Sequence, residues 1–131
     1  MSARARRIKR HVANLSSPDK KLSERAEANL IRYYGADAIP DLLPALQSDN
    51  PTVRFRAVWI LGKTRRPEVF DPILALCDDP DKAVRYDAVM ALGELGDSRA
   101  IEPLTAMDRL NDPTRPAQAA LHKLGVIADE E

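Results

Sequence analysis

Few side chains in this 131-residue sequence are of the types that carry out chemistry near neutral pH. The two histidines, His11 and His122, stand near opposite ends of the chain, and the single cysteine, Cys77, is followed by Asp78 and Asp79. A nucleophilic thiol needs a base and a low pKa, whereas neighbouring carboxylates raise the pKa of a thiol. One cysteine also excludes an internal disulfide and a cysteine-based zinc site. We therefore expect no catalytic residue, no metal and no cofactor, with Cys77 in the core and both histidines at solvated helix positions.

Two arginines recur at a fixed spacing. Arg54 and Arg85 lie 31 residues apart, and each is preceded by an acidic turn that contains Asp49 or Asp79 and Asp81. Arginine recognises carboxylates and carbonyls through its planar fork of N–H groups. We interpret both arginines as structural, tying one turn to the next. A ladder of cations for an acidic partner is the alternative.

A cationic segment with an aromatic residue inside it lies in the middle of the chain. No acid occurs from residue 51 to 67, and Trp59 stands among the cations. Interleaved cations and aromatic rings are typical of surfaces that bind nucleic acid. The neighbouring segments are mostly acidic, so we keep nucleic-acid binding as an alternative that the sequence does not favour. The basic patch consists of Arg54, Arg56, Lys63, Arg65 and Arg66.

The charges are unevenly distributed, although Lys plus Arg and Asp plus Glu both number 20. Residues 1–34 hold nine Lys and Arg against three Asp and Glu, a net charge of +6, and the rest of the chain balances it at −6. Ile8, Val12 and Leu15 form an apolar stripe on the basic first segment. We predict a capping helix over residues 1–17, because the end of a stacked fold needs a cover. Binding of an acidic ligand by this helix stays open.

The elements that position these side chains are predicted to be helices. Apolar residues recur at three and four, as in Val84, Ala88, Ala91 and Leu92, and no hairpin turn signal occurs. Prolines after polar residues predict helix starts at Ser17–Pro18, Asn50–Pro51, Asp79–Pro80 and Asp112–Pro113, and glycines predict left-handed helix ends at Gly35, Gly62, Gly93 and Gly125. The predicted helices span 3–15, 18–34, 38–47, 51–63, 68–77, 80–93, 98–110 and 113–125.

The sequence repeats with a period of 31 residues. PTVRFRAVWILG (51–62) aligns with KAVRYDAVMALG (82–93), and FDPILAL (70–76) aligns with IEPLTAM (101–107) at the same offset. Two successive helices that share one offset indicate a two-helix repeat unit. We predict a single domain over 1–131, with the cap, units at about 18–48, 49–79 and 80–111, a half unit at 112–125 and a tail at 126–131.

The run DDPDKAVRYDAVMALGELGDSRAIEPL (78–104) closely resembles HEAT-like repeats of the phycobilisome-lyase type. The resemblance implies an all-α fold, an α-solenoid of about three and a half helical hairpins plus the N-terminal helix. It also implies that second helices line a concave, partner-binding face. Transferred by position, the candidate partner-binding residues are Asp41, Gln47, Glu68, Asp71, Glu102 and Thr105. Their charge suggests a basic or polar partner segment.

These observations predict a protein that binds rather than catalyses. We expect a non-enzymatic scaffold or adaptor for another protein, whose identity the sequence does not reveal; an accessory or chaperone subunit of a lyase-type system is an alternative. No apolar run reaches the roughly 20 residues that span a bilayer, so we expect no membrane insertion and a cytoplasmic location. The last helix lacks a following helix, which predicts either a tail that folds back or self-association at this end.

Overall fold

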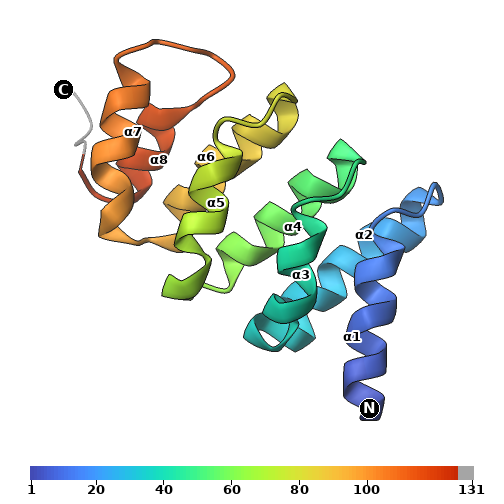
Figure 1. Cartoon of the computed structure of the whole chain (residues 1–131). Coiled ribbons are helices and arrows are strands. Elements are labelled where there is room, and N and C mark those ends of the chain that lie inside the picture. Colours follow the sequence, from blue (N-terminus) through green and yellow to red (C-terminus); the bar gives the residue numbers. More distant parts are fainter. Residues whose placement is uncertain (127–131) are drawn as a thin grey trace.

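The chain folds into two rows of stacked helices, and the predicted α-solenoid is confirmed (Figure 1). The computed structural model describes residues 1–126, and no strand occurs among them. The first row contains α2 (Lys20–Asn29), α4 (Pro51–Lys63), α6 (Lys82–Leu95) and α8 (Ala117–Lys123). The second row contains α1 (Ala3–Asn14), α3 (Ile39–Ala45), α5 (Phe70–Leu76) and α7 (Ile101–Asp108). None of the helices in this described part is long and apolar enough to cross a membrane.

Short irregular turns lead into the second-row helices. The π-helical turn η1 (Leu30–Tyr34) and the 3₁₀ turn η2 (Gly35–Ala38) precede α3, while the 3₁₀ turns η3 (Pro67–Val69) and η4 (Ser98–Ala100) precede α5 and α7. The predicted helices 18–34, 68–77 and 98–110 are therefore each shorter than expected. The 3₁₀ turns are tighter than an α-helix and redirect the chain within a few residues, which lets each second-row helix pack back on its partner.

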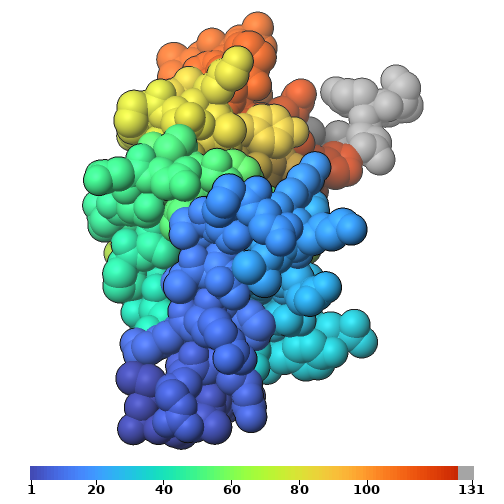
Figure 2. Space-filling model, turned by 90° about the vertical axis from the view of Figure 1, so that its right-hand side faces the viewer, coloured from blue at the N-terminus to red at the C-terminus, as the bar shows by residue number. Residues whose placement is uncertain are grey.

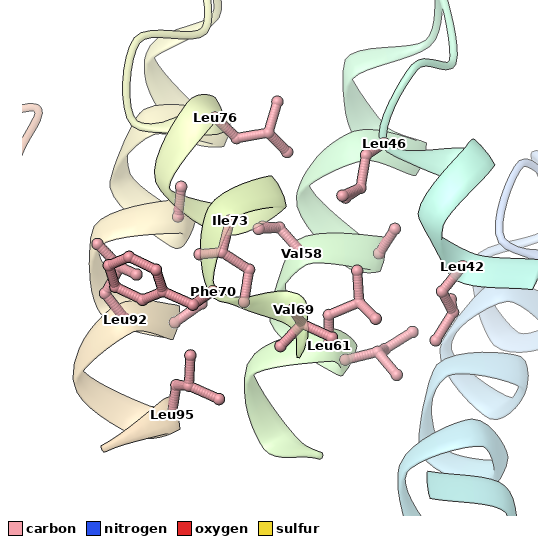
Figure 3. Packing of buried hydrophobic residues seen from close by; sticks show 14 of the residues in the cluster. Leu42, Leu46, Val58, Leu61, Val69, Phe70, Ile73, Leu76, Leu92 and Leu95 are labelled. Atoms are coloured by element: carbon pink, nitrogen blue, oxygen red, sulfur yellow. The ribbon is translucent and has the colours of Figure 1, made fainter. Parts of the chain in front are cut away.

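Aliphatic side chains fill the space between the two rows. Figure 3 shows Val58 and Leu61 of α4 with Ile73 of α5 and Leu92 of α6, and all four are fully buried. One continuous cluster runs from Ile8 to Leu121. Because each hairpin buries its apolar face against the next, no single unit is stable alone.

The first-row helices pack directly along one another, and glycine makes this approach possible. α4 runs along α6, and α6 along α8. A Cβ built on Gly62 would stand 2.8 Å from the Ala91 Cβ, and one on Gly93 would stand 3.0 Å from the Ala120 Cα. The prediction that Gly62 and Gly93 end their helices is wrong, because both lie inside α4 and α6. The left-handed residue after α6 is Gly96, with φ of 76°.

Of the four predicted polar–proline helix starts, Asn50–Pro51 matches the structure. The Asn50 side chain accepts the Thr52 N–H, with Pro51 as the first helical residue. The other three are wrong: Asp19 caps α2, Asp81 caps α6, and α8 begins only after Pro116. Asp79 is not available as a cap because its carboxylate binds an arginine, as described below.

The basic N-terminal helix covers one end of the stack (Figure 2). Ile8 and Leu15 are buried, and Val12 packs on the core. At the other end, Leu121 is buried in α8, while Leu110 and Val126 are exposed. The predicted fold-back of the tail concerns residues 126–131, and those after Val126 lie outside the described part.

Candidate protein-binding surface

The two repeated arginines bond between turns. Arg54 donates from Nε and Nη2 to the Asp79 carboxylate at 2.9 and 3.0 Å, and from Nη1 to the Ser48 carbonyl at 2.8 Å. Arg85 makes the corresponding contacts one unit later, to the Asp79 carbonyl at 2.9 Å and the Thr114 hydroxyl at 3.3 Å. Each guanidinium thus links its own turn to the next turn along the stack.

Asp79 is a buried charge that is stabilised by these contacts. Burial alone would raise the pKa of this carboxyl group, but the hydrogen bond from Arg54, the Asp81 N–H and the charges of Arg54 and Arg85 together lower its pKa. The Arg54 and Asp79 side chains are 14% and 5% exposed. Removing either partner of such a buried ion pair destabilises the fold, because the other charge is left buried and unpaired.

The basic patch predicted around Trp59 is largely neutralised within the chain. Arg56 bonds Glu27 of α2 at 3.0 Å, Lys63 bonds Glu94 of α6 at 3.0 Å, and Arg66 bonds the adjacent Glu68. Arg54 is held by Asp79, so of the five predicted cations Arg65 alone has no ion pair among the described residues. These cations mainly join neighbouring helices and do not form a track of free charges.

The candidate residues of the second row are spread along three hairpins. Asp41 on α3 accepts from Lys9 of the capping helix at 2.6 Å, and the Thr105 hydroxyl donates to the Ile101 carbonyl within α7. Asp71 and Glu102 are exposed at the starts of α5 and α7. Two further candidates are Glu68, which pairs with Arg66, and Gln47, which is exposed after α3.

The cysteine and the two histidines lie on different parts of the fold. Cys77 is fully buried, and burial together with the Asp78 charge raises its thiol pKa to about 12. His11 is half-buried against the Tyr34 ring at 5.6 Å, which corrects the expectation of a solvated position, whereas His122 is exposed on α8. Residues 1–126 contain no cluster of three His, Cys, Asp or Glu side chains that could hold a metal ion.

A groove along the first row was not predicted from the sequence. Trp59 of α4 and three residues of α6, Tyr86, Asp87 and Met90, line a hollow of about 290 Å³. A second hollow of about 270 Å³ lies on the other side of Tyr86 and Asp87, where Lys82, Ala83 and Thr114 complete its lining. We call these two adjoining hollows the first-row groove. The repeat alignment contained a signal for it, since Tyr86 aligns with Phe55 and Met90 with Trp59.

The groove combines apolar surface with one carboxylate. Tyr86 is 45% exposed, and the Lys63 ammonium group lies over the Trp59 ring at 4.7 Å from its centre. Asp87 is half-buried between them. Burial, together with the charge of Glu27, raises the pKa of Asp87 to about 6. Such a surface suits a partner that brings both apolar contact and positive charge.

Comparison with known proteins identifies the repeat. The profile of HEAT repeats matches residues 12–81 and again 39–125. The chain belongs to the HEAT repeat family. The matched residues extend from the capping helix to the end of α8, so the HEAT repeats account for nearly all of the described structure.

The most similar relatives include cyanobacterial proteins. The chain is 33% identical to a phycocyanobilin lyase subunit alpha of Thermosynechococcus vestitus, over 56% of this chain and 32% of the relative. It is 30% identical to an uncharacterized phycocyanin operon protein Z of Pseudanabaena tenuis, over 85% of this chain and 51% of the relative. A phycocyanobilin lyase subunit alpha of Pseudanabaena tenuis is 37% identical over 50% and 28%. The chain thus spans about half or less of the length of these relatives.

Proposed function

We propose that this HEAT repeat chain is a scaffold that binds another protein, without a bond-making step, through the first-row groove. The observation that carries the proposal is the contrast between the groove and the rest of the surface. Four of the five cations of the basic patch form ion pairs inside the chain, whereas the groove exposes an aromatic ring beside a carboxylate that has no partner among the described residues. Aromatic side chains in partly enclosed sites supply much of the binding energy of protein interfaces.

The surrounding fold supports a preformed groove. α6 packs against α4 on one side and α8 on the other, and Gly62 and Gly93 bring these helices into close contact. The groove residues other than Thr114 are therefore held on helices, with Trp59 on α4 and the others on α6. A surface that is already ordered loses little conformational entropy when a partner binds.

The second-row residues define an alternative face for the partner. Asp71 and Glu102 are exposed there, but Asp41 and Glu68 already have partners within the chain. A hollow of about 360 Å³ lies between the end of α7 and the start of α8, but none of the candidate second-row residues lines it. We therefore place the partner on the first row.

Nucleic-acid binding has weaker support. Phosphate binding depends on lysine and arginine side chains that are free to replace counterions, and four of the five cations in the basic patch form ion pairs. The capping helix also uses Arg4 and Lys9 to bond Asp37 and Asp41.

A second candidate function, that of a subunit of a lyase-type assembly, is favoured by the names of the relatives, two of which are phycocyanobilin lyase subunits. Its test is to add phycocyanobilin to the purified chain and record the visible absorption spectrum. A saturable spectral change with one equivalent of the chain supports a lyase-type role. An unchanged spectrum, both with the chain alone and with any protein that co-purifies with it, contradicts it.

The proposed binding face is tested with a matched pair of tyrosine variants. Tyr86 in the groove and Tyr33 on η1 are both exposed, at 45% and 59%. Tagged wild type, Tyr86→Ala and Tyr33→Ala are expressed in the cells that naturally make the protein, and co-purifying proteins are quantified by mass spectrometry after nuclease treatment. We expect at least one protein to be lost with Tyr86→Ala and retained with Tyr33→Ala. Equal recovery with all three chains would contradict the proposed face.

A further inference from the structure

Contacts between neighbouring first-row helices join residues that are 27 to 31 positions apart, and several of them join residues 29 positions apart. Glu27 of α2 accepts from Arg56 of α4, and Glu94 of α6 accepts from Lys123 of α8; each pair is 29 residues apart. Gly62 and Ala91, which meet between α4 and α6, have the same spacing. Other pairs differ by two positions, since Lys63 bonds Glu94 at a spacing of 31 and Gly93 meets Ala120 at a spacing of 27.

Asp87 differs from Glu27 and Glu94, because Arg115, the cation at this range of spacings, bonds the Cys77 carbonyl and Asp78 instead. The residue 29 positions after Asp87 is Pro116, which precedes α8 and has no N–H or cationic group to donate. Arg56 bonds Glu27, and Lys63 and Lys123 both bond Glu94. Asp87 therefore has no hydrogen-bond or ion-pair partner among the described residues.

The groups that surround Asp87 explain why its carboxylate would be stabilised by a cation. Tyr86, Trp59 and Met90 form the apolar side of the groove, Thr114 and Lys82 line its other end, and Glu27 adds a second negative charge from α2. Lys82 makes no ion pair with Asp87. A half-buried carboxylate in such surroundings is costly without a cation, and its raised pKa has the same cause.

We propose that an arginine side chain of the partner protein enters the first-row groove, bonds the Asp87 carboxylate and lies against the Tyr86 ring. This inference rests on the proposed function and names the chemistry of the partner. A guanidinium group fits better than an ammonium group, because its flat face stacks on an aromatic ring while its edge donates two parallel hydrogen bonds to one carboxylate. The partner would supply the cation that Asp87 lacks among the described residues.

The single tryptophan provides the test, because Trp59 lies in the groove and reports on it alone. The full chain is titrated with the peptide acetyl-Gly-Arg-Gly-Arg-Gly-amide, and both Trp59 fluorescence and backbone amide chemical shifts are recorded. Peptides with lysine or glutamate in place of arginine are the comparison probes. We expect saturable shifts centred on Trp59, Tyr86 and Asp87 with the arginine peptide, several-fold weaker binding of the lysine peptide and none of the glutamate peptide.

Matched charge variants decide whether Asp87 is responsible. Asp87→Asn is expected to weaken binding of the arginine peptide at least about tenfold, as a charge-assisted hydrogen bond is lost. Asp71→Asn removes an exposed acid of α5 and is expected to leave the affinity unchanged. Amide spectra of both variants verify that they are folded.

Two results would overturn the inference. One is an equal loss of affinity with Asp87→Asn and Asp71→Asn, which would indicate general attraction to a charged surface. The other is a set of peptide shifts confined to the second row. Either result leaves the proposed function intact if Tyr86→Ala still loses a cellular partner, so the two proposals fail separately.

Discussion

Replacing Asp87 by asparagine should make the protein more stable. The carboxyl pKa rises from 3.8 to about 6 on folding, because Asp87 is half-buried and lies near Glu27. Two pKa units correspond to about 3 kcal/mol. Solvent screens a half-exposed group, so we expect roughly half of this value, about 1–2 kcal/mol at pH 7. Asp87→Asn should therefore raise the melting temperature by about 4 °C for each kcal/mol.

The sign of the pH dependence provides a stricter test. Between pH 3.8 and about 6 the folded state keeps the Asp87 proton while the unfolded state has lost it. The contribution of protonated Asp87 to the free energy of unfolding is therefore fully present below pH 3.8 and is lost as the pH rises through about 6. The difference in the free energy of unfolding between Asp87→Asn and wild type should be near zero at pH 4 and reach its plateau by pH 7.

Urea unfolding followed by circular dichroism from pH 4 to 8 measures this difference. Asp71→Asn is the matched control and should change the free energy of unfolding by less than about 0.5 kcal/mol throughout. A destabilising effect of Asp87→Asn at pH 7, or a difference that does not vary between pH 4 and 7, would refute the reasoning. A more stable variant that has lost its partner is the behaviour expected of a residue retained for binding.

Three further predictions follow from the contacts described above. Arg54→Ala should destabilise the fold by about 3 kcal/mol in urea unfolding, because it leaves Asp79 buried and unpaired. The control variant Arg66→Ala removes one partner of an exposed ion pair and should lower the free energy of unfolding by less than about 0.5 kcal/mol. Similar losses for the two variants would contradict the structural role of Arg54. Gly62→Ala should lower the free energy of unfolding by about 1–2 kcal/mol despite the better helix propensity of alanine, since the new Cβ would overlap Ala91. A second substitution, Ala91→Gly, should restore part of the lost stability. A Gly62→Ala variant that is more stable than wild type would mean that α4 and α6 are farther apart. Fluorescence anisotropy should detect no binding of duplex DNA at about 150 mM salt, and tight, salt-sensitive binding would show that the basic patch is available.

The repeat made most of the fold predictable. Aligned segments 31 residues apart predicted helical hairpins, and Asn50–Pro51 correctly predicted where α4 begins. The glycine errors have one physical cause. Gly62 and Gly93 have the spacing of helix-ending residues, but they are needed where two helices approach too closely for a Cβ. Sequence periodicity within one helix does not reveal what the neighbouring helix places against it.

The helix-cap errors have a related cause. Asp79–Pro80 has the local pattern of a helix start, but the Asp79 carboxylate bonds Arg54 from the preceding unit, and Asp81 takes over as the cap. A long-range ion pair thus outweighs a local preference. The repeat spacing of Arg54 and Arg85 indicated a structural role for both, and the structure adds the acceptors.

The repeat alignment paired Tyr86 with Phe55 and Met90 with Trp59, but it did not show that Trp59, Tyr86 and Met90 line one groove. Alignment at 31 residues compares equivalent positions and does not reveal which side chains of neighbouring helices meet, as Glu27 and Arg56 do. The missing partner of Asp87 becomes visible only in the structure. The sequence therefore favoured the acidic residues of the second row as the partner-binding face, whereas the structure favours the groove on the first row.

Photo-crosslinking in the cells that naturally make the protein tests the central claim most directly. A photoreactive benzoylphenylalanine replaces either Tyr86 in the first-row groove or Asp71 on the second row, and crosslinked proteins are identified by mass spectrometry. We predict a discrete crosslinked protein from position 86 and none from position 71. Crosslinks from position 71 alone, or the absence of any crosslink from position 86, would contradict a scaffold that binds its partner through the first row.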